Sequence, residues 1–219
     1  MKNKSKTWIY QTLILGVLLI VVSRCKESDT KLITPETGSY TDPRDGKIYK
    51  TVKIGDQWIM AENLAYKPDQ GNFWAYDNDS GNVAIYGYLY DWETAKNVAP
   101  EGWHLPTRAE WIIFRKSLGG RNFTFNKAGG SSTTVYNKMV SGGSSGFNAL
   151  FGGICYENGK KCMQLGELGD FWSYTDSNDG PWHCFVTIPH SSLGNKDGIA
   201  ALKSYDNRLG GKSVRLFKD

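Results

Sequence analysis

The stretch Gly102–Trp111, which reads Gly-Trp-His-Leu-Pro-Thr-Arg-Ala-Glu-Trp, contains the clearest structural signal in the chain. Thr107 can accept from the free amides at a helix start, and Glu110, three residues later, can reach back to the Thr107 amide. Large apolar side chains then recur at helical spacing as far as Leu118, and the pair Gly119-Gly120 is typical of a helix end. The pattern predicts a helix over Arg108–Leu118.

A second, shorter helix is predicted upstream of this block, and a hairpin before that. Asp91–Asn97 has an amphipathic pattern that ends before Pro100. Further back, the turn signal Asp45-Gly46 precedes Lys47–Ile54, in which Ile48, Lys50, Val52 and Ile54 share one face. Gly55-Asp56 then turns the chain into Gln57–Met60, which predicts a short antiparallel hairpin.

Beyond Gly120 the apolar residues come in short bursts separated by glycine-rich turns, which predicts long loops and short strands. Lys212–Lys218 alternates in polarity, so we expect a last strand that pairs with the first one. The predicted fold class is therefore α+β, with two short helices packed on small antiparallel sheets and a long, loop-rich second half.

The first 25 residues have the parts of a secretory signal. Lys2, Lys4 and Lys6 form a basic start, and the apolar run Leu13–Val22 follows. Its ten residues would reach only about 15 Å as a helix, roughly half of a ~30 Å hydrocarbon core. Val22-Ser23-Arg24-Cys25 resembles the lipobox of bacterial lipoproteins, which implies acylation at Cys25. Arg24 stands where that motif has a small residue, so an uncleaved anchor is the alternative.

The remaining chain divides into a tether and one domain. Residues 26–44 contain Pro35, Pro43 and many small polar side chains, which favours a flexible tether, and 45–219 is left as the domain. The formal charge of +4 arises from the four basic residues before Cys25, which are Lys2, Lys4, Lys6 and Arg24. Without them the chain has 22 basic residues, equal to its 22 acidic residues. A near-neutral body gives no electrostatic reason to expect nucleic acid as a partner.

Several ordered blocks over Asp45–Asp219 resemble the Fibrobacter succinogenes major paralogous domain family. They are Asp45-Gly46, Tyr49–Gly55, Trp58–Leu64, Tyr86–Trp92, Gly102–Thr107 with Glu110-Trp111, Gly146–Gly153, Phe171–Thr175 and Ser213–Arg215. The resemblance implies an exported lipoprotein of the Bacteroidetes and Fibrobacteres group, located in the cell envelope and lipid-anchored at the outer membrane. It implies no particular reaction.

The block around Thr107 is also similar to that of the formylglycine-generating, sulfatase-modifying family. That resemblance implies a C-type-lectin-like fold with paired terminal strands. The cysteines Cys155, Cys162 and Cys184 do not stand where those enzymes carry theirs, so the enzyme activity is not transferred.

Three motifs have both a chemical and a structural interpretation. Gly142–Gly146 matches G-x-S-x-G, with Asp170 and His183 downstream, but a small-residue loop is favoured over a nucleophile elbow. Cys155 and Cys162 can bridge a hairpin and leave Cys184 as a buried thiol, and a metal site from Cys184 and His183 is the alternative. His104 is predicted to be a packed, hydrogen-bonded histidine in preference to a general base. No catalytic residue is assigned.

The candidate ligand site lies in the loop-rich half. Aromatic faces stack on sugars, and Asp and Asn oxygens suit calcium. The candidates are Trp172, Tyr174, Asp176, Asn178, Asp179 and Trp182. The structural alternative is that the tryptophans belong to the core and the polar loop is a turn.

We expect a non-catalytic module tethered at the cell surface or in the periplasm, which binds a polysaccharide or a cell-surface protein. It would need no cofactor, with calcium as a possible ligand, and its lipid would contact the membrane. The alternatives are an enzyme of unknown reaction on the same fold and a structural envelope lipoprotein.

Overall fold

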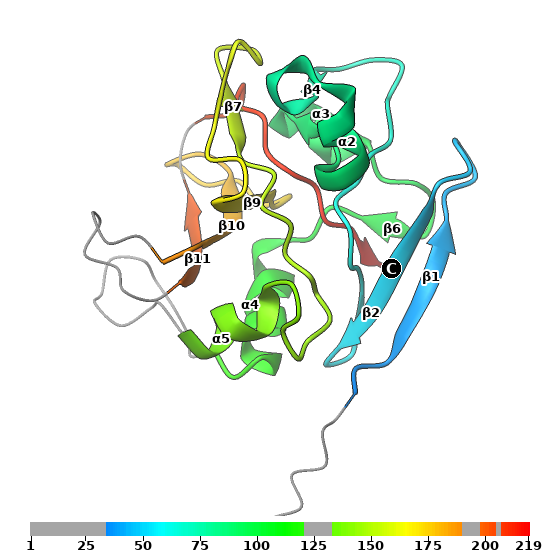
Figure 1. Ribbon diagram of the computed structural model, residues 1–219, viewed down its shortest axis with the longest axis vertical. Helices are drawn as coiled ribbons and strands as arrows, with labels where there is room; N and C mark the ends of the chain where they lie inside the picture. Colours follow the sequence, from blue (N-terminus) through cyan, green and yellow to red (C-terminus); the bar gives the residue numbers. More distant parts are fainter. Residues whose placement is uncertain (1–33, 121–132, 190–197, 205–206) are drawn as a thin grey trace, which may run out of the picture. The chain divides into compact units, whose positions relative to one another are not determined.

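The computed structural model describes residues 34–120, 133–189, 198–204 and 207–219. The expected signal sequence with Cys25, and residues 26–33 of the expected tether, lie outside the described residues. Thr34–Asp219 forms one compact unit, which Figure 1 shows coloured along the chain.

The unit is α+β, as the sequence predicts, with short helices and small antiparallel sheets (Figure 1). In chain order its elements are β1 (Thr37–Thr41), β2 (Ile48–Ile54), β3 (Gln57–Met60), β4 (Phe73–Trp74), η1 (Tyr76–Asn78), α2 (Ser80–Tyr86), β5 (Leu89–Tyr90), α3 (Trp92–Asn97), β6 (Trp103–His104), α4 (Arg108–Ser117), α5 (Thr133–Met139), β7 (Ile154–Tyr156), β8 (Lys161–Met163), β9 (Leu168–Trp172), β10 (Trp182–Thr187), β11 (Ile199–Ser204) and β12 (Phe217–Lys218).

The largest sheet has five strands in the order β1-β2-β3-β12-β6. The predicted hairpin is present, since β2 and β3 pair antiparallel with Val52 opposite Ile59. β1 corrects the tether prediction, because residues 37–41 pair with β2 along their whole length. These residues are mostly polar and exposed, so they lack the apolar alternation that reveals a strand; their partner strand determines their structure.

Both predicted helices are confirmed within about one residue. α4 begins with the expected capping box: Glu110 N donates to Thr107 Oγ1 over 3.2 Å, and Thr107 N donates to Glu110 Oε2 over 2.7 Å. α3 is capped by Asp91, whose side chain accepts from Thr94 N. In both helices a polar side chain accepts a hydrogen bond from a backbone amide of the first turn, which has no partner within the helix.

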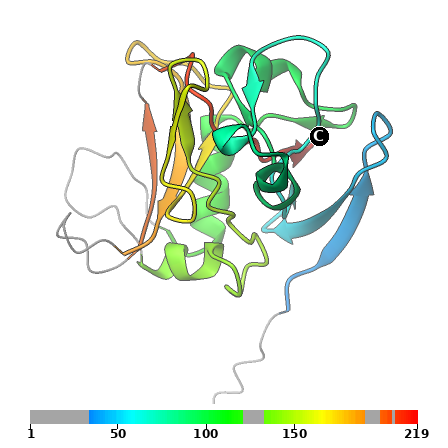
Figure 2. The ribbon, with the colours of Figure 1, turned by 45° about the horizontal axis from the view of Figure 1, so that its top comes forward.

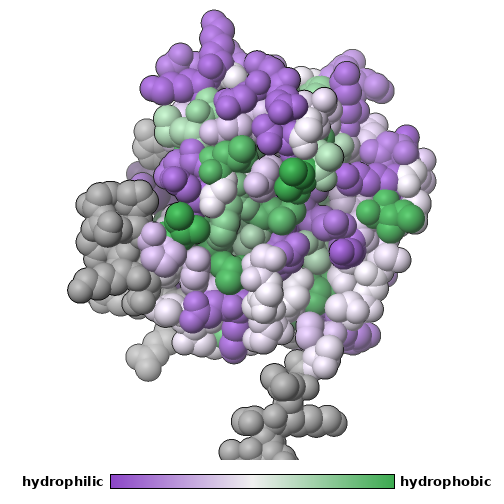
Figure 3. Space-filling model, viewed as in Figure 1, coloured by the Kyte–Doolittle hydropathy of each residue, from purple (hydrophilic) through white to green (hydrophobic). Residues whose placement is uncertain are grey.

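Two helices, α2 and α5, were not predicted, so the expectation of two helices was incomplete. α2 contains Gly81 and has no buried residue, and its Ile85 is 60% exposed. α5 has seven residues, of which Val135 and Met139 are buried. Such short segments carry too few apolar positions to establish a period. Figure 3 shows apolar side chains gathered near the middle of one face, over α2 and the segments of the chain beside it.

Two large apolar clusters form most of the core of the described residues, and a third, small cluster contains Tyr76, Leu89 and Cys155. The first lies between the large sheet and the sheet β11-β10-β9, and α4 and α5 fill it (Figure 2). Trp111, Phe114 and Phe147 are among its largest side chains, and their rings contact one another edge-on or tilted. The second cluster packs α3 and β5 against Trp103, Trp172 and Leu216.

The C-terminal segment Gly211–Phe217 crosses between these clusters and is buried throughout. The expected strand over Lys212–Lys218 is present as β12 only at its last two residues, and it pairs with β3 and β6 and not with β2, the first predicted strand. Upstream, single bridges join Gly211 to Cys155, Lys212 to Tyr90 and Ser213 to Phe171. The segment changes partner at almost every residue, which explains why it forms no longer strand.

Arg215 is completely buried in this segment. Its Nε donates to Asn63 Oδ1 over 2.6 Å, and Nη1 donates to the carbonyl oxygens of Met60 and Phe147. Nη2 donates to the carbonyl oxygen of Asn148 over 2.7 Å. Burial lowers the pKa of Arg215 to about 9, so the guanidinium is still charged at neutral pH. Four neutral oxygens therefore solvate a buried cation in place of water.

We predict that Arg215→Met lowers the free energy of unfolding by at least about 3 kcal/mol, because it leaves several buried oxygens without a donor. Denaturant unfolding of the variant measures this loss. Arg208→Met removes an exposed arginine with a surface ion pair and should cost no more than about 1 kcal/mol. Equal losses in the two variants would contradict the role given to Arg215.

Candidate functional site

The six residues predicted as a ligand site do not form one surface. Trp172 is completely buried, donates from Nε1 to the Tyr90 carbonyl over 2.7 Å and packs in the second core cluster. It therefore cannot stack on a ligand from solvent, and its assignment as a binding residue was wrong. Its burial follows from its place in β9, all five residues of which are buried.

The other five candidates lie nearer the surface. Tyr174 is 54% exposed, and Asn178 and Asp179 are exposed. Both Asp176 carboxylate oxygens accept from the Arg208 guanidinium, over 2.8 and 3.0 Å. That hydrogen bond lowers the pKa of Asp176 and competes with any cation for the same oxygens. Trp182 is half-buried, with the Arg108 guanidinium 4.2 Å from its ring centroid.

The cysteines are arranged as the bridged hairpin requires. Cys155 and Cys162 stand opposite each other in β7 and β8 and are joined by a disulfide. Cys184 is a free thiol in the first core cluster, where burial raises its pKa to about 12. Cys184 and His183 are neighbours in one strand, so their side chains point to opposite faces of the sheet. No group of three potential metal ligands occurs among the described residues.

The serines of the G-x-S-x-G pattern have local roles. Ser145 is buried, donates from Oγ to the Lys138 carbonyl and accepts from Phe147 N. Ser144 is exposed in the same turn. Within the described residues neither serine contacts His183, so the structure assembles no triad from this motif.

Asp170 and His183 do meet, in a buried polar cluster with Lys212. His183 Nδ1 lies 2.6 Å from Asp170 Oδ1, and Lys212 Nζ donates to Asp170 Oδ2 over 2.8 Å. All three side chains are at most 8% exposed. Burial alone would raise the pKa of Asp170, but His183 and Lys212 outweigh it and lower the pKa to about 2.

The charge state of this cluster determines the histidine tautomer. Burial lowers the pKa of His183, Asp170 opposes this effect and Lys212 adds to it. Because the ionised Asp170 can only accept, Nδ1 of the neutral imidazole must carry the proton. Nε2 is then an unprotonated acceptor, and no described residue donates to it. The sequence named Asp170 and His183 only in connection with the G-x-S-x-G pattern, and it did not single out Lys212, which lies 42 residues from Asp170 along the chain.

We predict that acid destabilises the protein partly through His183. Its folded-state pKa lies below the unfolded value of ~6.5, so the unfolded state takes up more protons and stability is lost as pH falls below that value. The fall in Tm between about pH 7 and pH 5 should therefore be smaller in His183→Gln than in the unsubstituted chain. An unchanged pH dependence would show that His183 does not contribute.

His104 is hydrogen-bonded on both ring nitrogens. Nε2 lies 2.8 Å from Glu110 Oε1, and Nδ1 lies 2.6 Å from Asp219 Oδ1. Glu110 thus serves the helix cap and the histidine together. This agrees with a packed histidine, and it identifies the partners that the sequence did not.

An open aromatic cleft, which sequence reasoning missed, crosses the large sheet. It has a volume of about 370 Å³, and its lining includes Tyr40, Thr51, Trp58, Glu101, Trp103 and Lys218. Tyr40 and Trp103 pack with ring centroids 5.1 Å apart, and Trp58 is half-buried. Gly38 leaves room above Trp58, since a Cβ there would lie 3.6 Å from the indole.

The residues of the aromatic cleft share a face through strand register. Thr51 and Trp58 come from β2 and β3, Tyr40 from β1, and Trp103 and Lys218 are directly paired in β6 and β12. The available sequence signals were Trp58 within the predicted hairpin and Trp103 in the block before α4. The contribution of β1 was hidden because that strand had been assigned to the tether.

The fold and the aromatic cleft define a small α+β domain with an open, aromatic-lined surface. The chain belongs to the Fibrobacter succinogenes major domain family, whose model matches residues 52–218. No match to this chain is found among curated proteins or among solved structures. Among the described residues, no helix is long and apolar enough to cross a membrane.

Proposed function

We propose that this chain is a non-catalytic binding module, tethered to the cell envelope by a lipid on Cys25, and that it binds polysaccharide in the aromatic cleft. The observation that carries the proposal is the combination of the half-buried Trp58 indole and Tyr40 phenol with hydroxyl and charged side chains in one open hollow. Aromatic faces pack against the C–H faces of sugars, and the polar groups satisfy hydroxyls.

We also propose that the domain is C-type-lectin-like. In support, strands from both ends of the domain, β1 with β2 and β12, lie in one sheet, and the part after α4 is rich in loops. A protein partner in place of a polysaccharide remains an outcome of the binding experiment below.

The enzyme hypothesis draws on one observation, the Asp170–His183 contact, which resembles the base and orienting group of many hydrolases. His183 Nε2 is buried, however, so a substrate atom would have to displace packed side chains to reach it. Binding is therefore the better-supported function.

We predict that Trp58→Ala weakens polysaccharide binding roughly tenfold or more, because a central aromatic anchor contributes about 2 kcal/mol. Glycan-array screening of the full chain followed by calorimetry measures the change. Tyr174→Ala is the matched control, since Tyr174 is exposed but lies outside the cleft. Loss of binding in Tyr174→Ala alone would move the site to the surface first predicted from sequence. If no glycan on the array binds and the chain instead captures a purified cell-surface protein, the result favours a protein partner.

We predict that Cys25→Ala abolishes incorporation of labelled fatty acid and releases the protein from membranes in its native host. Ser23→Ala is the control and should leave both unchanged. Protease treatment of intact cells then distinguishes the surface from the periplasm. Fatty-acid labelling that persists in Cys25→Ala would contradict the lipid anchor.

A further inference from the structure

The surface of the described residues has two more hollows. The tyrosine hollow, about 510 Å³, is bounded by Tyr66, Tyr88, Lys67 and the α2 residues Val83 and Ala84. The α3 hollow, about 340 Å³, is bounded by Gln70, Glu93 and Val98. These volumes lie in the lower part of the range of roughly 300–1,000 Å³ for a single ligand site, so none alone would hold a long polymer.

Arg44 joins these hollows. It lines the tyrosine hollow, and its Nη1 donates over 2.8 Å to the carbonyl oxygen of Val98, which lines the α3 hollow. Two chain segments connect this point to the aromatic cleft, Tyr40 to Arg44 and Val98 to Glu101. The contacts at their two ends hold these segments together: Arg44 donates to the Val98 carbonyl, and the Tyr40 ring packs on Trp103, two residues after Glu101.

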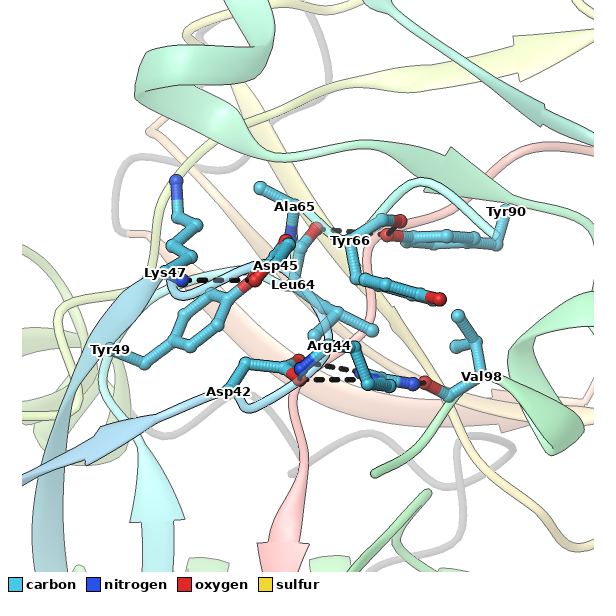
Figure 4. A network of polar contacts seen from close by, with 10 residues as sticks. All are labelled: Asp42, Arg44, Asp45, Lys47, Tyr49, Leu64, Ala65, Tyr66, Tyr90 and Val98. Atoms are coloured by element: carbon cyan, nitrogen blue, oxygen red, sulfur yellow. Dashed lines mark hydrogen bonds and ion pairs between the residues drawn. The ribbon is translucent and has the colours of Figure 1, made fainter. Parts of the chain in front are cut away.

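Arg44 is held rigidly in place. Its Nε and Nη2 donate to the two Asp42 oxygens over 2.8 and 2.6 Å, and its guanidinium lies 3.7 Å from the Tyr66 ring centroid. Figure 4 shows the guanidinium against the Tyr66 ring, with Asp42 and Val98 at its two ends. Its side chain is still 24% exposed. A fixed, flat and partly exposed group suits contact with a ligand because little conformational entropy is lost on binding.

The charges along this surface nearly balance. The basic residues that line it are Arg44, Lys47, Lys67 and Lys218, and the acidic residues are Asp45, Asp69, Glu93 and Glu101. A surface selective for an acidic polymer would carry an excess of one sign. The remaining lining is aromatic, hydroxyl, small apolar or amide, which suits a neutral hydroxylated ligand.

We propose that the three hollows are subsites of one groove, and that its ligand is an internal stretch of a neutral polysaccharide chain that passes over Arg44. This rests on the proposed function and deepens it by naming the ligand class and its length. The groove then binds several sugar units, and affinity rises with chain length until the tyrosine hollow is filled.

The test measures Kd by calorimetry for the full chain with cello-, xylo-, manno-, laminari- and malto-oligosaccharides, from disaccharide to octasaccharide. We expect affinity to rise about tenfold or more with length in one series. Ala84→Trp places a large side chain on an exposed wall of the tyrosine hollow and should remove that gain while disaccharide binding is unchanged. Ala109→Trp, on an exposed position of α4 outside all three hollows, should keep the gain.

The outcomes separate the two proposals. Binding that requires Trp58 but does not increase with length overturns the groove and leaves the aromatic cleft intact. A length gain that survives Ala84→Trp also overturns it. Tighter binding of oligogalacturonates than of every neutral series overturns the neutral class. No binding to any oligosaccharide overturns the groove and polysaccharide binding together.

Discussion

The buried guanidinium of Arg215 is the interaction on which the rest of the structure depends. Its N–H groups donate hydrogen bonds to oxygens of Met60 at the end of β3, of Asn63, and of the Phe147-Asn148 turn. The rings of Phe147 and Phe171 lie 4.6 and 5.5 Å from its central carbon. Since a buried cation without these partners would be strongly unfavourable, the four contacts form together or not at all.

A second buried cation secures the same segment three residues earlier. Lys212 binds Asp170 of β9, and Asp170 in turn holds His183 of β10. The segment Gly211–Phe217 is thus attached to the large sheet by Arg215 and to the smaller sheet by Lys212. Its position also sets that of Lys218 and, through strand pairing, of Trp103. The shape of the aromatic cleft is therefore a consequence of polar contacts buried behind it.

The sequence predicted what local chemistry determines. The capping box of Thr107 and Glu110, the hairpin around Gly55-Asp56 and the spacing of Cys155 and Cys162 all act within a few residues of chain. β1 could not be predicted in this way, because a run of Thr, Gly and Ser becomes a strand only through its partner. The aromatic cleft and the Arg215 site could not be predicted for the same reason. Trp58 and Trp103 become neighbours only through tertiary packing, and so do Asn63 and Arg215. Trp172 shows the converse error: it was predicted to bind a ligand because it stands near a polar loop, but it is part of the core.

The C-terminal position of Arg215 has a consequence for the timing of folding. Met60 and Arg215 are 155 residues apart, and at roughly 5–20 residues per second a ribosome needs about 8 to 30 seconds to make the chain between them. During that interval neither apolar cluster can close, since Leu216 and Phe217 are also missing. A chain that cannot complete its core until its last residues are made is still unfolded during that time, and the export proposed for this chain would require an unfolded chain.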